Sequence, residues 1–318
     1  MSLLIVVQQM IVIFLLILSG FILFRLNLID DNASKALSNI VVNITNPAIL
    51  ILSAFDDGPK ESLSDIGLAL VPILLIYAFL IGFSYIWPRI LNIPREDYFA
   101  YKMIIVYGNT GFLGIPLVSA LVGPSGLIYV SLVCLIFNFL IYTYGLGILR
   151  NEAEKNSEHK SSLNVADRKK NELKKLINPG TISAILTIIL YLCDIKAPEF
   201  VTDTLSYSGN CTTYLSMIVL GVAIAQTTPK KIFFDGKMYI HILVRQILIP
   251  ICIALVLKQF VSNQLILNVL VIEFAVAAGN MPLMFSKQLG LKCETISRGV
   301  ILTTLFTIAT IPIVLLFI

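Results

Sequence analysis

Two short segments carry the residue types that can bind an anion inside an apolar environment. Residues 108–116 read GNTGFLGIP and residues 277–282 read AAGNMP. Proline removes a backbone donor and glycine lets a chain unwind, so each segment is expected to interrupt a helix. The N–H groups freed at the start of the next half-helix, together with its dipole, favour a negative charge. Asn109 and Asn280 add side-chain amides that can donate to a carboxylate without burying a full charge.

The chain around these segments is too apolar for a soluble protein. Of its 318 residues, 57% are hydrophobic and 13% are charged, and the mean hydropathy is +0.90. Soluble domains carry about 25% charged residues. The apolar residues gather in runs of about 20, the length of a helix that crosses a bilayer. An all-α membrane protein is therefore predicted, and a soluble enzyme is excluded.

Ten apolar runs separated by charge clusters are expected to be the membrane spans. The first has no basic segment before it and no small-residue cleavage site after it, so a retained helix is favoured over a signal peptide. The fourth and ninth runs contain the two proline segments. The ten runs lie near residues 3–24, 34–55, 66–88, 98–122, 125–149, 178–195, 203–226, 238–258, 264–287 and 295–318.

The basic residues predict the orientation of these spans. If the ten spans alternate, 20 of the 23 Lys and Arg residues lie on the side that contains the loop 150–177. Cytoplasmic loops of membrane proteins carry an excess of Lys and Arg. We therefore expect a multi-pass protein of the cell (plasma) membrane, with the loop 150–177 in the cytoplasm and both termini outside.

The loop also divides the chain into two halves of similar length. Residues 1–149 and 178–318 each hold five predicted spans, and the polar stretch 150–177 is the linker. An odd number of spans places the second half upside down in the membrane, as in transporters built from inverted repeats. In such proteins the substrate binds at the midplane, where equivalent helices are broken. Pro116 and Pro282 both fall about 18 residues into their runs, so spans 4 and 9 are expected to be the broken pair.

Three runs of sequence resemble the auxin efflux carrier family: GNTGFLGIPL (108–117), AAGNMPLMFSKQLG (277–290) and GFILFRLNLIDDNASKALSNIVVNITNPAIL (20–50). The family includes plant auxin carriers and bacterial permeases for malate, malonate and related organic acids. The resemblance implies ten helices in a five-plus-five inverted repeat and a homodimer. It also implies a scaffold of spans 1, 2, 6 and 7, and a moving unit of spans 3–5 and 8–10 with the substrate at the crossing of spans 4 and 9.

The resemblance also implies particular site residues. Asn109 matches the asparagine that binds the substrate carboxylate in plant carriers, and Asn138 matches a polar position that contacts substrate there. Phosphoregulation of the central loop is not carried over, because the loop has only about 28 residues. An aromatic, auxin-like substrate is not carried over either. The candidate substrate-binding residues are Asn46, Asn109, Thr110, Gly111, Gly114, Pro116, Asn138, Gly279, Asn280, Met281 and Pro282.

Glu273 is the only acidic residue inside a predicted membrane core. It precedes Asn280 by seven residues, which places both on a similar helix face. An ionised carboxylate there costs about 2–3 kcal/mol, so the side chain is expected to be protonated part of the time. That behaviour suits a residue that couples transport to protons. The alternatives are an ion pair with Arg245, a hydrogen bond to a neighbour, or a position near the outer rim.

Other polar residues of the spans have open interpretations. Arg245 and His241 lie four residues apart in the eighth span, where snorkelling to the cytoplasmic surface is favoured over an anion-attracting funnel. Asn43 and Asn46 share a face of the second span just before Pro47. They either line the substrate path or hydrogen-bond to each other between helices.

An enzyme is the weakest interpretation. Residues 123–126 read GPSG, a form found around the serine of intramembrane rhomboid proteases. The predicted orientation places Ser125 at the outer end of its span and His241 at the inner end, too far apart for a nucleophile and its base. The string is expected to be a tight turn. The five cysteines and two histidines show neither CxxC nor HExxH spacing, so no metal, redox site or cofactor is predicted.

These observations favour a secondary carrier of small organic anions that works by elevator-like alternating access. A proton or a sodium ion is the candidate coupling ion for a symporter, and uniport is the uncoupled form. One alternative is a sodium-coupled symporter resembling the bile acid carriers. Another is a membrane sensor without flux that signals through the loop 150–177. The expected partners are the bilayer, the anion and a second copy of the chain, with no nucleic acid.

Overall fold

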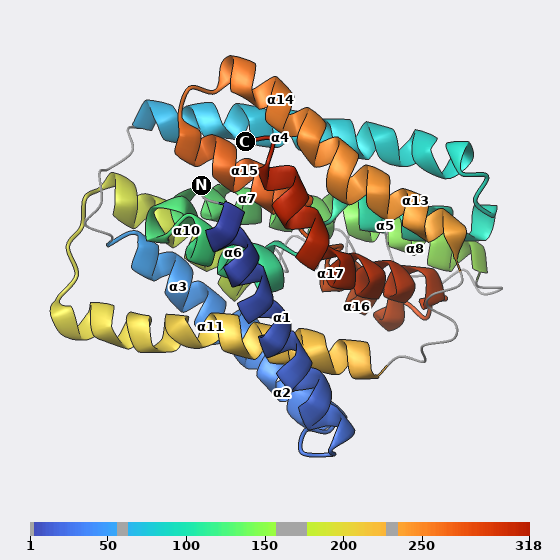
Figure 1. The fold of residues 1–318 in the computed structure, drawn as a ribbon, viewed down its shortest axis with the longest axis horizontal. Helices are drawn as coiled ribbons and strands as arrows, with labels where there is room; N and C mark the ends of the chain where they lie inside the picture. Colours follow the sequence, from blue (N-terminus) through green and yellow to red (C-terminus); the bar gives the residue numbers. More distant parts are fainter. Residues whose placement is uncertain (1–2, 56–62, 157–176, 227–234) are drawn as a thin grey trace.

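Helices make up all the regular structure in the described residues. The computed structural model describes residues 3–55, 63–156, 177–226 and 235–318 (Figure 1). Within these ranges, seven helices are long and apolar enough to cross a membrane, which agrees with the predicted class of all-α membrane protein. Three further apolar helices are shorter: Thr110–Leu121, Pro179–Leu192 and Gln264–Ala275. They lie in the fourth, sixth and ninth predicted runs, so the count of ten spans and the inverted repeat stay predictions.

The order of elements follows the predicted runs. In the first half these are α1 (Leu3–Arg25), α2 (Asp31–Ile40), η1 (Val41–Thr45), α3 (Asn46–Ser53), α4 (Leu63–Ile90), α5 (Tyr98–Val106), η3 (Thr110–Gly114), α6 (Ile115–Leu121), α7 (Leu127–Leu140), η5 (Ile141–Gly145) and α8 (Leu146–Asn156). The second half contains α10 (Pro179–Leu192), α11 (Glu199–Ala225), α13 (Gly236–Ile242), η6 (Leu243–Leu248), α14 (Ile249–Phe260), α15 (Gln264–Ala275), α16 (Asn280–Gln288) and α17 (Glu294–Leu315). The predicted linker 150–177 lies largely outside the described residues.

Three segments of π-helix in the described residues stand just before prolines that lie within helices. The π-helical segments η1, η3 and η6 each end two residues before a proline, at Pro47, Pro116 and Pro250. A proline ring clashes with the carbonyl four residues back, and the wider π turn relieves that clash. The helix of the fourth run therefore continues through Pro116. Its interruption lies upstream, between Val106 and Thr110, where the glycine and asparagine of the motif stand.

Two glycines bring α1 and α11 into backbone contact. A Cβ atom built on Gly221 would lie 2.0 Å from the carbonyl oxygen of Ile17, and one built on Gly20 would lie 2.3 Å from that of Ile218. Small residues allow such close approach between membrane helices, whose association depends on van der Waals packing. The two helices cross each other in Figure 1, and this contact holds α1 against the second half of the chain.

We therefore expect Gly221→Ala to lower the stability of the purified protein. The added methyl group overlaps the backbone of α1, and overpacking of this kind costs about 1–3 kcal/mol. The matched control is Gly82→Ala, because a Cβ on Gly82 of α4 meets no atom within 4 Å. Thermal unfolding in detergent should show a lower midpoint for Gly221→Ala only. Equal midpoints for the two variants would contradict the close packing.

Candidate functional site

The two interrupted segments lie side by side, as the sequence predicts. Gly108 and Ala278 form an antiparallel β-bridge, in which the Asn109 N–H donates to the Ala277 carbonyl at 2.7 Å and the Gly279 N–H to the Tyr107 carbonyl at 2.8 Å. We refer to residues 107–109 and 276–279, joined in this way, as the crossing. In the interior of a membrane each unpaired backbone group costs several kcal/mol, so this pairing makes both interruptions tolerable.

The crossing requires a glycine at one position in particular. A Cβ atom on Gly279 would lie 2.8 Å from the carbonyl oxygen of Gly108. Any other residue would push the two segments apart and break the bridge. The close approach of the two backbones therefore explains why residue 279 is a glycine.

Asn109 begins the half-helix that follows the first interruption. Its Oδ1 accepts a hydrogen bond from the Phe112 N–H at 3.2 Å, so the side chain is the N-cap of the helix Thr110–Leu121. Its Nδ2 is buried and has no hydrogen-bond partner among the described residues. A buried donor without a partner is costly, and it lies beside first-turn N–H groups that the helix itself cannot use. Helix starts with free N–H groups are general binding positions for anions.

Asn46 extends from α3 toward the same half-helix. Its Nδ2 donates to the carbonyl of Gly111 at 3.2 Å, and its buried Oδ1 has no partner in the described part of the chain. Asn43 is exposed and donates to Asn39 of its own helix at 2.9 Å. The expectation that Asn43 and Asn46 share a face is therefore wrong. The wider turn of η1 separates them, and Asn46 alone joins the site.

The remaining predicted site residues divide between the crossing and a neighbouring interface. Asn138 is buried on α7 and lies against Gly180 of α10. A Cβ atom built on Gly180 would lie 3.5 Å from the Asn138 Nδ2. Cys134, one turn earlier on α7, interacts with Thr110. At the half-helix starts, Thr110, Gly114, Pro116 and Pro282 are buried, whereas Gly111, Asn280 and Met281 are partly exposed.

Glu273 lies at the crossing and not at an outer rim. Its side chain is 1% exposed, and neither carboxyl oxygen has a hydrogen-bond partner among the described residues. A Cβ atom on Gly114 would lie 2.4 Å from its Oε1, so the carboxyl group packs against the start of the half-helix capped by Asn109. The alternatives of an ion pair with Arg245 and of a hydrogen bond to a neighbour do not hold in the described residues.

Arg245 is bound to both C-terminal half-helix ends instead of snorkelling to the surface. It is 3% exposed, and its Nε donates to the Ile105 carbonyl at 2.6 Å and its Nη1 to the Phe274 carbonyl at 2.5 Å. Ile105 and Phe274 are the penultimate residues of α5 and α15. Each helix C-terminus is the negative end of a dipole, so two ends together are an electrostatic match for one guanidinium, although they add no net charge. This match explains why the snorkelling and funnel interpretations of Arg245 are wrong.

His241 is also buried, so the snorkelling expectation is wrong for it too. Its side chain is fully buried, its Nδ1 accepts from the Trp87 Nε1 at 3.2 Å, and its ring meets Tyr101 edge-on at 5.5 Å. The expected turn at 123–126 is confirmed, because Gly123 has a φ of +97° and Pro124–Gly126 forms a 3₁₀ turn.

Two residues that support the crossing were missed from sequence. Thr303 of α17 accepts from the Ala278 N–H through its Oγ1 at 2.9 Å. Gln246 donates to the Thr303 carbonyl at 3.0 Å and to Thr307 Oγ1 at 2.9 Å. The available signals were the adjacent polar pair 245–246 and the helically spaced threonines of the last span. Neither signal distinguishes a functional role from local hydrogen bonding.

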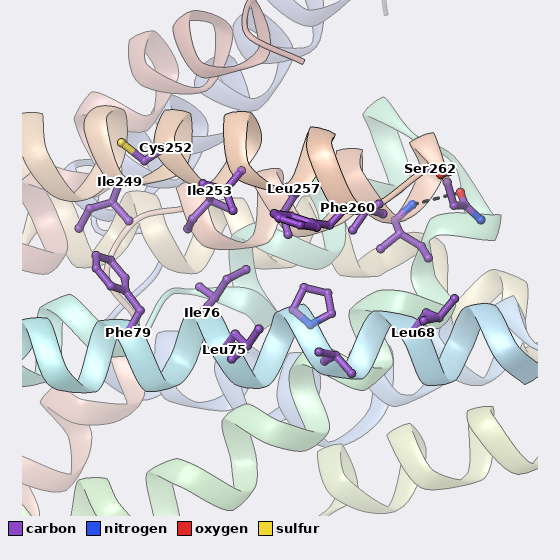
Figure 2. Close-up of a pocket in the computed structure, with 16 residues that line it drawn as sticks. Leu68, Leu75, Ile76, Phe79, Ile249, Cys252, Ile253, Leu257, Phe260 and Ser262 are labelled. Carbon is purple, nitrogen blue, oxygen red and sulfur yellow. Dashed lines mark hydrogen bonds between the residues drawn. The ribbon is translucent and has the colours of Figure 1, made fainter.

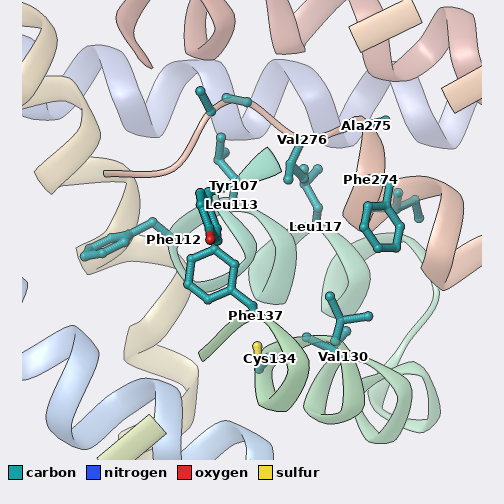
Figure 3. Close-up of a cluster of buried hydrophobic side chains, with 14 of the residues drawn as sticks. Tyr107, Phe112, Leu113, Leu117, Val130, Cys134, Phe137, Phe274, Ala275 and Val276 are labelled. Atoms are coloured by element: carbon teal, nitrogen blue, oxygen red, sulfur yellow. The ribbon is translucent and has the colours of Figure 1, made fainter. Parts of the chain in front are cut away.

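Apolar side chains surround the interruptions on the α7 side (Figure 3). The ring of Tyr107 meets that of Phe137 edge-on at 5.6 Å, and Phe274 meets Tyr77 of α4 in the same way at 5.1 Å. These four rings are buried, so charges and dipoles on this side of the crossing interact more strongly than they would in water.

A separate hollow of about 700 Å³ lies between α4 and α14 (Figure 2). Its walls are almost entirely apolar, and side chains such as Leu75, Phe79 and Phe260 are more than half exposed. No predicted site residue lines it. Its chemistry suits lipid chains and not a carboxylate.

The fold and this site define a multi-pass membrane protein of the transporter class. The chain belongs to the family described as membrane transport proteins, which it matches over residues 5–315, and the resemblance to auxin efflux carriers is thereby confirmed. It is 24% identical to an uncharacterized transporter of Methanocaldococcus jannaschii over 311 residues, 95% of each chain. It is 28% identical over 116 residues to an uncharacterized transporter of Methanothermobacter thermautotrophicus, covering 36% of this chain and 37% of the relative.

Removing the guanidinium should destabilise the crossing. Arg245→Gln leaves two buried carbonyls without their charged donor, which should cost about 3 kcal/mol. The matched control is Arg89→Gln, because Arg89 is exposed at the end of α4. Thermal unfolding of the purified variants measures the difference. A midpoint for Arg245→Gln equal to that of the control would show that the two hydrogen bonds do not stabilise the fold.

Proposed function

We propose that the protein is a secondary active transporter of small organic anions, such as mono- or dicarboxylates. The observation that carries this proposal is the buried Nδ2 of Asn109, which has no partner in the described residues and lies at the start of the half-helix Thr110–Leu121. It provides a neutral donor beside a positive helix end, which suits a carboxylate better than a cation or an apolar molecule. Membership in a family of membrane transport proteins supports flux as the role of this site.

The carboxylate would be held by Asn109 and by first-turn N–H groups near Thr110 and Gly111. Asn280 and Met281 begin the opposite half-helix and would complete the site from the other side of the crossing. Asn46 and Asn138 would face the rest of the substrate. Gly111, Asn280 and Met281 are partly exposed, so a substrate would reach the site from their side.

The proposed mechanism is elevator-like alternating access. Residues 1–149 and 178–318 would form the two inverted repeats, joined by the cytoplasmic linker 150–177. Spans 1, 2, 6 and 7 would be the scaffold, and the close packing of α1 on α11 supports a rigid unit there. The crossing is held by side chains of η6 and α17, which supports its movement as one body with spans 8 and 10. A homodimer in the cell membrane with external termini, working by symport or uniport, completes the proposal.

Carboxylate binding should stabilise the purified protein, and Asn109→Ala should remove the effect. A ligand at about 100 times its dissociation constant stabilises by about 2.7 kcal/mol, which thermal unfolding detects. The panel is lactate, acetate, malate, malonate and succinate. Asn43→Ala is the control, because Asn43 is exposed and bonds only to its own helix.

The expected result is a rise in the unfolding midpoint with at least one acid for the unchanged protein and for Asn43→Ala. Transport of that acid into proteoliposomes should follow the same pattern. If Asn109→Ala responded to every acid as the unchanged protein does, the site assignment would be wrong.

A further inference from the structure

The charges at the crossing are not balanced by direct pairing. Arg245 makes no ion pair with any described residue, and its guanidinium cannot lose its proton in a protein. Glu273 is the residue next to Phe274, whose carbonyl Arg245 binds, yet its carboxyl oxygens contact no donor among the described residues. Helix dipoles orient charges but add no net charge. The crossing, taken together with Arg245 and Glu273 that lie against it, therefore carries +1 when Glu273 is neutral. One negative charge makes this group of residues neutral.

Two groups can supply that negative charge, and both lie at the same helix start. The carboxyl group of Glu273 packs against Gly114, four residues after Thr110, where the half-helix begins. The proposed substrate carboxylate would lie at Asn109, beside the first turn of that half-helix. Two like charges at one buried helix end repel each other strongly, so they do not occupy it together.

The other groups around Glu273 do not replace either charge. Tyr77 of α4 and Cys134 of α7 interact with it electrostatically, and both are neutral in their usual protonation states. Gly114 presents no side chain, and Arg245 of η6 is brought to the same helix end because it binds the carbonyl of Phe274, the residue after Glu273. The exchange therefore involves Arg245, Glu273 and the substrate alone.

We propose that ionised Glu273 and the substrate carboxylate alternate as the counter-charge of Arg245, so that each carboxylate is carried with one proton. A proton from the aqueous phase binds a carboxylate oxygen of Glu273 as the substrate arrives, and it leaves to the opposite phase when the substrate does. The loaded crossing holds Arg245⁺, neutral Glu273 and one carboxylate. The empty crossing holds Arg245⁺ and ionised Glu273. Both forms are neutral, so both can move through the membrane.

This inference rests on the proposed function. It predicts that Glu273→Gln affects substrate exchange and net uptake differently. The loaded variant is still neutral, so exchange of internal for external substrate should persist within about threefold of the unchanged protein. The empty variant carries an uncompensated positive charge through the membrane. Its return should slow, and net uptake should fall by about tenfold or more. A role in folding alone would lower both activities together.

The experiment uses the full chain in proteoliposomes with [¹⁴C]lactate, whose single negative charge equals the one that neutralises Arg245, and it measures exchange alone with [¹⁴C]malate and [¹⁴C]malonate. Exchange is measured with unlabelled acid inside, net uptake is measured with an inward proton gradient, and proton entry is followed with internal pyranine. Glu294→Gln is the matched control, because Glu294 is an exposed acid in the first turn of α17. The control should retain exchange, net uptake and proton entry.

The expected result for Glu273→Gln is retained exchange with lost net uptake and lost proton entry. Proton-driven net uptake at the level of the control would overturn the inference while leaving the proposed function intact. Loss of exchange along with net uptake would also overturn it, because Glu273 would then be needed to hold the substrate. Absence of any exchange by the unchanged protein would overturn the proposed function itself.

Discussion

The structure depends on one constraint, which is that a backbone leaving the helical conformation inside a membrane must find new hydrogen-bond partners. Residues 107–109 and 276–279 are each other's partners through the bridge of Gly108 with Ala278. Thr303 accepts from the Ala278 N–H, and Arg245 donates to the carbonyls at the ends of α5 and α15, which this pairing does not satisfy. Because these side chains come from α17 and η6, the crossing fixes the positions of helices far apart in sequence.

The same constraint gives the crossing a polarity. The C-terminal ends of α5 and α15 are bound by a guanidinium that belongs to the protein. At the start of the half-helix Thr110–Leu121, Asn109 keeps a side-chain donor without a partner among the described residues, and the carboxyl group of Glu273 packs nearby. This polarity is the basis on which we propose an anionic substrate. It also keeps the interior polar without a permanent acid and base in contact.

Much of this site followed from sequence because the signals were local. Glycine, asparagine and proline within 108–116 and 277–282 identified both interruptions, and their similar depth in two halves of the chain predicted that they meet. The position of Arg245 did not follow, because its partners are backbone carbonyls, and any residue type can offer these. Asn43 and Asn46 were placed on one face because a regular helix was assumed, whereas η1 widens the turn between them. The contact of Glu273 with Gly114 likewise depends on how two helices cross, which spacing in one helix does not determine.

The most direct test of the central claim is the position of a bound carboxylate. A cryo-electron microscopy map of the protein with a saturating acid from the stabilising panel would give that position. The account predicts density between the two half-helix starts, with a carboxylate oxygen within hydrogen-bond distance of Asn109 Nδ2. Density only in the apolar hollow between α4 and α14, with an empty crossing, would contradict it.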